Sequence, residues 1–292
     1  EVLVVDDGSS DGGPELIEAR FADARVKVLR QANAGPGAAR NRGLTDARGA
    51  LVTFLDADDE WRPELLERAV ERLAAHLECA AFTAAFFNEP AGEDRWVALR
   101  PYGFEEGVWR LSPQTPQFHL KHVADAFHPT TAVYRTEVVR KYGGFFERRC
   151  TFGEDVYLWI QILLNHPIYR HMTPLAHYHM EDSQLGIGGR RGPLPIEPVL
   201  EFPDPIRAVC PEPMRRTLEL WLGYQAIRAA FMQLDRGDPA AAPRVLKRFP
   251  GAGAWGGRYL QARARIAFPG FYAAARAAKR LLGRRAKPVP GA

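Results

Sequence analysis

The fold of this chain is decided by the stretch EVLVVDDGSSDGGPELIEARFADARVKVLRQANAGPGAARNRGLTDARGALVTFLDADDEW, residues 1–61. Short apolar runs alternate there with segments of helical length, the arrangement typical of a sheet covered by helices. The stretch therefore predicts an α/β fold with a mostly parallel sheet flanked by helices. The pattern predicts strands at residues 2–5, 26–29 and 51–55, and helices at 14–21, 38–48 and 63–76.

The rest of the chain predicts three regions. Residues 1–185 form a first domain, residues 186–213 a Gly- and Pro-rich connector, and residues 214–292 a basic helical extension. Residues 88–128 carry too many Gly and Pro residues for a prediction. Beyond residue 76, the apolar pattern predicts strands at 80–87 and 131–134 and helices at 136–142, 155–164, 214–234, 241–249, 257–268 and 271–285.

Composition limits the class of protein. The 292 residues are 46% hydrophobic and 25% charged, as in globular proteins. The longest apolar run, residues 80–87, is far shorter than the roughly 18 residues of a membrane-spanning helix, which predicts that no segment of the chain is one. Cys79, Cys150 and Cys210 are widely spaced, which argues against a disulfide framework and a thiolate zinc site. We expect a reducing, cytoplasmic location.

Charge divides the chain. Residues 201–292 hold 17 Lys and Arg against 6 Asp and Glu, a net charge of +11, whereas residues 1–200 have a net charge of −7. The acidic part is a poor surface for nucleic acid, and we expect no nucleic-acid partner. The basic helices fit an anionic membrane surface, and a protein bound this way would be peripheral on the inner face of the cell membrane. The alternative is a helical cap whose basic face is simply solvated.

Two acidic clusters follow predicted strands. Asp6 and Asp7 follow the first, where open α/β sheets bind ligands, and capping of the next helix by Asp11 does not account for them. Asp56, Asp58 and Asp59 follow the third predicted strand. Carboxylates this close repel one another unless a cation intervenes, and oxygen ligands favour Mg²⁺ or Mn²⁺. The alternative for these three is a solvated acidic turn.

A glycine-containing loop precedes the helix at 38–48. It resembles a dinucleotide-binding fingerprint only weakly, because Arg40 stands where that pattern needs a third glycine. Arg40 and Arg42 could instead offer guanidinium donors to a nucleotide diphosphate, with backbone amides at the start of the helix. The alternative is a surface helix whose arginines meet only water.

Taken in order, these segments resemble family 2 glycosyltransferases with the GT-A fold. The similarity is strong over residues 2–73 and weaker to residue 183. It implies an enzyme that transfers a sugar from a nucleotide-diphosphate donor to a saccharide or lipid-linked acceptor with inversion, in cell-surface polysaccharide or glycolipid synthesis. The family opens with a further strand and helix, so we expect this chain to be a fragment. The matching segments are VVDDGSSDG at 4–12, NAG at 33–35, ARNRG at 39–43, ARG at 47–49 and FLDADD at 54–59.

The resemblance also implies roles for individual residues. Asp7, assisted by Asp6, would accept a hydrogen bond from the base of the nucleotide, and Arg40 would lie near the base or diphosphate. Asn33 and Gly35 would belong to the same nucleotide-sugar site. Asp56 and Asp58 would meet the ribose and a divalent metal, Mn²⁺ or Mg²⁺, with Asp59 as a further metal ligand. The metal would neutralise the departing diphosphate.

Two downstream segments resemble the family as well. The acidic pair Glu154 and Asp155 is similar to its Glu-Asp motif, and Asp155, ahead of Glu154, is the expected base that deprotonates the acceptor. The alternative is favourable charge at a helix N-terminus. His179 falls in a segment that matches a Tyr-Arg-x-His-x-x-Ser motif imperfectly. Ala176 and His177 replace the Tyr and Arg, and Ser183 lies one position late. His179 could contact the metal or diphosphate, or be structural.

Two other functions stay open. A sugar nucleotidyltransferase would share the fold class and metal carboxylates, but the Gly-rich loop with Arg and Lys usual near its first strand is not seen. A catalytically silent GT-A-like module that docks by its basic tail is the second. Release of nucleoside diphosphate or of pyrophosphate separates the two enzymes, and no release would favour the silent module.

Overall fold

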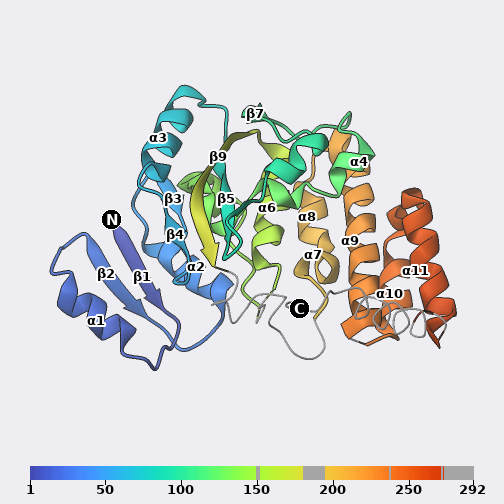
Figure 1. The fold of residues 1–292 in the computed structure, drawn as a ribbon, viewed down its shortest axis with the longest axis horizontal. Coiled ribbons are helices and arrows are strands. Elements are labelled where there is room, and N and C mark those ends of the chain that lie inside the picture. The colour runs from blue at the N-terminus through green and yellow to red at the C-terminus, as the bar shows by residue number, and fades with distance from the viewer. Residues whose placement is uncertain (149–151, 180–194, 237, 271, 273–292) are drawn as a thin grey trace, which may run out of the picture. The chain divides into compact units, whose positions relative to one another are not determined.

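The computed structural model describes residues 1–148, 152–179, 195–236, 238–270 and 272, and it divides into two compact units (Figure 1). Unit 1 comprises residues 1–191 and 196–218, and unit 2 comprises residues 192–195 and 219–292. Apart from residue 272, the predicted helix at 271–285 lies outside the described residues, and so does the end of the imperfect motif, residues 180–183.

The described strands of unit 1 form two sheets. In the smaller sheet, β1 (Val2–Asp6) runs parallel to β2 (Val26–Arg30). The larger sheet has the order β3-β8-β5-β9-β4, while β6 pairs with β5 and β7 with β9. Its strands are β3 (Leu51–Thr53), β4 (Glu60–Trp61), β5 (Ala81–Glu89), β6 (Glu93–Asp94), β7 (Gly107–Trp109), β8 (Val133–Arg135) and β9 (Ile168–His179).

The strand directions correct one expectation. In the larger sheet only β5 and β9 pair in parallel, and the other pairs are antiparallel. Strand β8 returns after a long excursion through residues 90–132 rather than through one crossover helix, so nothing forces it to be parallel. The α/β class with flanking helices is confirmed, but the sheet is mixed rather than mostly parallel.

The helices of unit 1 lie close to the predicted positions between residues 13 and 165. Two more, α7 and α8, occupy the predicted connector, because Pro198 and Pro203 stand in their first turns, where proline favours a helix. The α-helices are α1 (Gly13–Arg20), α2 (Pro36–Asp46), α3 (Leu65–Ala75), α4 (Gln117–Leu120), α5 (Thr136–Lys141), α6 (Glu154–Asn165), α7 (Pro198–Glu201) and α8 (Pro203–Val209). The 3₁₀ helices are η1 (Val97–Tyr102), η2 (Ala124–Ala126), η3 (Pro129–Thr131) and η4 (Glu212–Met214).

Helices α3 and α6 cover opposite faces of the larger sheet. Val133 of β8 belongs to the buried cluster that includes α3, whereas its neighbour Tyr134 bonds to Trp159 of α6. Because successive strand residues point to opposite faces, the two helices lie on different sides, as Figure 1 shows. The α3 cluster consists of Leu65, Ala69, Leu73, Cys79, Phe82, Ala84, Phe86, Val133, Tyr169, Leu175 and Ala176.

Strand β9, which the sequence pattern did not predict, lies beside β5 in the middle of the sheet (Figure 1). Its polar residues and Pro174 break the apolar pattern. The pairing with β5 shifts register beside Pro174, which is how a sheet accommodates a proline. Arg170 is only 2% exposed and lies over the rings of Phe104 and Trp109, so an apparent surface residue belongs to the interior.

Unit 2 is helical. It contains most of α9 (Arg215–Arg236), then α10 (Ala241–Arg248), the 3₁₀ helix η5 (Pro250–Trp255) and α11 (Gly257–Ala267). Helix α9 approaches η5 closely, since a Cβ added at Gly223 would lie 2.3 Å from the Ala252 nitrogen. The Trp255 indole donates a hydrogen bond of 2.8 Å to the Leu220 carbonyl and fastens the same contact. Within the described residues, no helix has the length and apolar character needed to cross a bilayer.

One glycine allows α2 to approach the start of α6. A Cβ added at Gly37 would lie 2.2 Å from the Phe146 carbonyl oxygen and 3.4 Å from the Cβ of Glu154. Because the near atom belongs to the backbone, no side-chain rotation could relieve the clash.

We therefore expect Gly37→Ala to lower the free energy of unfolding by about 1–3 kcal/mol, the usual effect of overpacking, despite the better helix propensity of alanine. Gly43→Ala in the same helix is the matched control, because its Cβ would meet only the Val5 methyl at 3.3 Å. Urea unfolding measures both variants. Equal stability of the two would contradict this account of the α2 approach.

Candidate functional site

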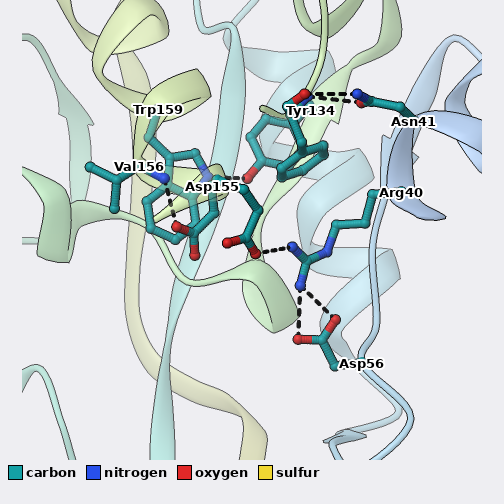
Figure 2. A network of polar contacts seen from close by, with 9 residues as sticks. Arg40, Asn41, Asp56, Tyr134, Asp155, Val156 and Trp159 are labelled. Carbon is teal, nitrogen blue, oxygen red and sulfur yellow. Dashed lines mark hydrogen bonds and ion pairs between the residues drawn. The ribbon is translucent and has the colours of Figure 1, made fainter. Parts of the chain in front are cut away.

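The centre of the candidate site is a buried arginine between two carboxylates, here called the Arg40 clamp (Figure 2). Arg40 of α2 donates from Nη2 to both oxygens of Asp56, at 2.8 and 3.0 Å, and from Nη1 to Glu154 at 2.8 Å. The side chains of Arg40 and Glu154 are each 9% exposed, and that of Asp56 is 39% exposed. The clamp thus joins α2, the segment after β3, and the start of α6, and it brings together three residues predicted to form the site.

The charges of the clamp support one another. Burial opposes the charged form of Arg40, but the carboxylates of Asp56 and Glu154, with Asp155 nearby, outweigh burial and raise its pKa. The guanidinium also lies 5.2 Å from the centre of the Phe145 ring, a cation–π contact. Arg40 is therefore a fixed positive charge in the site.

Asp155 lies beside the clamp and does not belong to it. It accepts a 2.6 Å hydrogen bond from the Val156 amide (Figure 2). Burial, reinforced by the nearby charge of Glu154, raises the pKa of Asp155 to about 7. A carboxylate with a pKa near neutrality can take up a proton at physiological pH, which is the property a general base requires.

Asn41, the residue after Arg40, fixes the other side of α2. Its Oδ1 accepts from the Phe145 amide at 2.8 Å, and its Nδ2 donates to the Phe145 carbonyl and to Glu147, both at 2.7 Å. Gly144 has a φ of +76°, and a Cβ there would lie 2.2 Å from Asn41 Oδ1. No role for Asn41 was predicted, although an asparagine inside a predicted helix, where this residue is unfavourable, was a usable signal.

Asp7 shapes the loop that leads into α2. Its Oδ1 accepts from Gln31 Nε2 and from the Ala34 amide, and its Oδ2 accepts from the Gly35 amide, each at 2.8 Å. The Asp7 carbonyl also accepts from Asn33 Nδ2 at 3.0 Å. In this structure both carboxylate oxygens hold the chain's own loop, so the predicted contact of Asp7 with a nucleotide base remains a prediction.

Asp6 and Asp58 are the more available carboxylates. Asp6 accepts from the Ser9 amide at 2.8 Å, and the hydrogen bonds from Ser9 lower its pKa. Asp58 is partly exposed, and no hydrogen bond or ion pair to its carboxylate is seen within the described part of the chain.

Asp59, by contrast, is turned inward. It is 7% exposed and accepts from the Thr130 hydroxyl and, at 3.2 Å, from the His179 amide. Burial raises the pKa of Asp59 to about 6. With both oxygens committed, Asp59 ties η3 to the end of β9, which does not favour its predicted role as a metal ligand.

The described residues contain no group of three His, Cys, Asp or Glu side chains that could hold a metal by themselves. A single available carboxylate such as Asp58 suits an ion that takes most of its ligands from phosphate and water, and the role of Asp58 as a metal ligand remains a prediction. His179 Nε2 is buried and has no hydrogen-bond partner among the described residues, so the place of His179 in such a site remains a prediction.

Comparison with known proteins is consistent with this geometry. The model of "Glycosyl transferase family 2" matches residues 1–143. The "Succinoglycan biosynthesis protein ExoO" of Rhizobium meliloti is 47% identical over 76 residues, 26% of this chain and 22% of that protein. The "Uncharacterized glycosyltransferase EpsJ" of Bacillus subtilis is 29% identical over 159 residues, 53% of this chain and 45% of that protein. The chain thus spans about a fifth to a half of the length of these relatives.

A solved structure shows the same fold. The crystal structure of S. aureus TarS 1-349 in complex with UDP-GlcNAc has a TM-score of 0.53 and 19% identity, covering 85% of this chain and 62% of that one. This likeness confirms the predicted GT-A fold.

The clamp predicts a large effect on stability when Arg40 is replaced. We expect Arg40→Met to lower the free energy of unfolding by about 3 kcal/mol, because Glu154 would remain buried without its partner. Arg42→Met is the control in the same helix: Arg42 is 47% exposed and pairs with Asp46 at 3.5 Å, a contact worth about 0.5 kcal/mol or less. Denaturant unfolding gives both values, and a similar loss in the two variants would refute the clamp's role.

Proposed function

Residues 1–143 of this chain belong to glycosyl transferase family 2, and from that premise we propose that the protein transfers a sugar from a nucleotide-diphosphate donor to a hydroxyl of a saccharide or lipid-linked acceptor. The observation that carries the proposal is the Arg40 clamp with Asp155 beside it. The TarS structure of the same fold holds UDP-GlcNAc, which supports a nucleotide-sugar donor. The relative ExoO is named for succinoglycan biosynthesis, which supports a role in polysaccharide synthesis.

In the proposed reaction Asp155 takes the proton from the acceptor hydroxyl as that oxygen attacks the anomeric carbon. Attack from the face opposite the diphosphate inverts the configuration at that carbon. Arg40 holds the Glu154 and Asp56 carboxylates in place, so the base is presented from a rigid helix start. A divalent ion held by Asp58, Mn²⁺ or Mg²⁺, would neutralise charge on the diphosphate.

The first test is product release. We expect the protein, incubated with UDP- and GDP-sugars and Mn²⁺, to release nucleoside diphosphate. Asp155→Asn should lower kcat by about 10²–10⁴-fold, the usual contribution of a general base. The rate should rise with pH and level off above about 7, because Asp155 accepts a proton only after it has lost its own.

Other outcomes have clear meanings. Pyrophosphate release would indicate a nucleotidyltransferase, and no release in the presence of acceptor would favour a silent binding module. Activity retained in Asp155→Asn but lost in Glu154→Gln would make Glu154 the base. A rate that falls as pH rises through 7 would contradict the assignment of a base with this pKa.

We further propose that unit 2 contacts an anionic membrane surface. Helix α11 leaves Leu260 and Phe268 each 65% exposed, and Arg258 and Arg263 lie on the same helix. Apolar and basic side chains together are the features of helices that lie in the lipid interface. The net charge of +11 in residues 201–292 adds attraction to anionic lipid.

Flotation with vesicles of phosphatidylglycerol and phosphatidylcholine checks this. We expect binding that weakens with added salt and falls at least about tenfold in the Leu260→Glu, Phe268→Glu double variant, which loses the apolar contact. Leu77→Glu, at a residue 75% exposed in unit 1, is the control. Binding that survives the double change, or that Leu77→Glu impairs equally, would discard the α11 surface.

A further inference from the structure

His128 lies in a cluster of three aromatic rings at the end of the larger sheet that carries the site. Its ring centre is 4.0 Å from that of Phe86 near the end of β5 and 4.7 Å from that of Tyr178 near the end of β9. The next residues continue into η3, where Thr130 donates to Asp59 and the Thr130 carbonyl accepts from the Trp61 indole at 2.6 Å. The position of His128 is therefore fixed from several sides.

The ring is close enough to the Arg40 clamp to feel its charges. Burial lowers the pKa of His128 to about 4, with a smaller opposing effect of Asp56 and a smaller reinforcing effect of Arg40. The imidazole is therefore neutral at physiological pH, with one donor and one acceptor nitrogen. Its Nδ1 is buried and has no hydrogen-bond partner among the described residues.

A buried polar nitrogen without a partner is rare in folded proteins and indicates a missing ligand or water. We infer that His128 hydrogen-bonds a hydroxyl group of the sugar that the donor carries, as a positioning residue in the sugar subsite. The inference rests on the proposed function and extends it from the nucleotide to the sugar.

Two features favour the sugar over the diphosphate. A neutral imidazole offers no net charge to a diphosphate, which binds most strongly to charged donors. A sugar hydroxyl can donate or accept, so it can pair with Nδ1 in either tautomer of the imidazole. Phe86 and Tyr178 add aromatic surface, which commonly lines small-molecule sites beside a few placed polar groups.

The experiment compares ligands with and without the sugar. Calorimetry with Mn²⁺ measures the affinity of UDP-glucose, UDP-GlcNAc and GDP-mannose against that of UDP or GDP. In His128→Phe, which keeps the aromatic stack but not the hydrogen bond, we expect the affinity of the best-bound nucleotide sugar to fall about tenfold, while that of its nucleoside diphosphate stays unchanged. His128→Asn, which retains an amide, should recover part of the loss.

His166→Phe is the matched control. His166 is also partly buried beside a tyrosine, since its Nε2 lies 3.0 Å from the Tyr142 hydroxyl, and burial likewise lowers its pKa. It should alter neither affinity. Equal loss for sugar-bearing and sugar-free ligands in His128→Phe, no loss for either, or no extra affinity from the sugar in the unaltered protein would each overturn the inference. Turnover by the unaltered protein decides the proposed function separately.

Discussion

A guanidinium removed from water must be paired, because an isolated charge in a protein interior is strongly unfavourable. In this chain that requirement falls on Arg40, which meets Asp56 and Glu154 at hydrogen-bond distance. The pairing holds α2 against two later segments, since Asp56 is 16 residues and Glu154 is 114 residues further along the chain than Arg40. Asp155 and Asn41 then take their positions as neighbours of the clamp's own members, so the candidate base and the loop at 144–147 both depend on it.

The clamp also leaves negative charge in excess. One arginine pairs with Asp56 and Glu154, with Asp155 nearby, and the charge of Glu154 adds to burial in raising the pKa of Asp155. Asp58 adds a further carboxylate nearby. A site with this surplus would repel a diphosphate in the absence of a cation, which is the electrostatic reason for the metal in the proposed reaction.

Sequence reasoning placed three helices and three of the four strands in the first 76 residues, missing the two-residue β4, and it named the three members of the clamp. It could do so because apolar spacing and polar residues at strand ends are local signals. It could not show that Arg40 binds the carboxylates of Asp56 and Glu154. Nor could it show that the carboxylates of Asp7 and Asp59 accept hydrogen bonds from the chain's own backbone amides and, for Asp59, from a hydroxyl. Those pairings join distant segments. Strand β9 was not predicted because Arg170, Pro174 and neighbouring polar residues interrupt the apolar pattern of a buried strand. His128 was not predicted because it lies in a region whose many Gly and Pro residues allowed no structural prediction.

The absence of a side chain at Gly37 has a practical consequence for protein engineering. Anyone raising the thermal tolerance of this chain by filling α2 with better helix formers would choose alanine there first. That methyl group would clash with the carbonyl of Phe146, a residue whose amide donates a hydrogen bond to the Glu154 carbonyl. Redesign of α2 therefore has to treat residue 37 as part of the candidate site, although it carries no side chain.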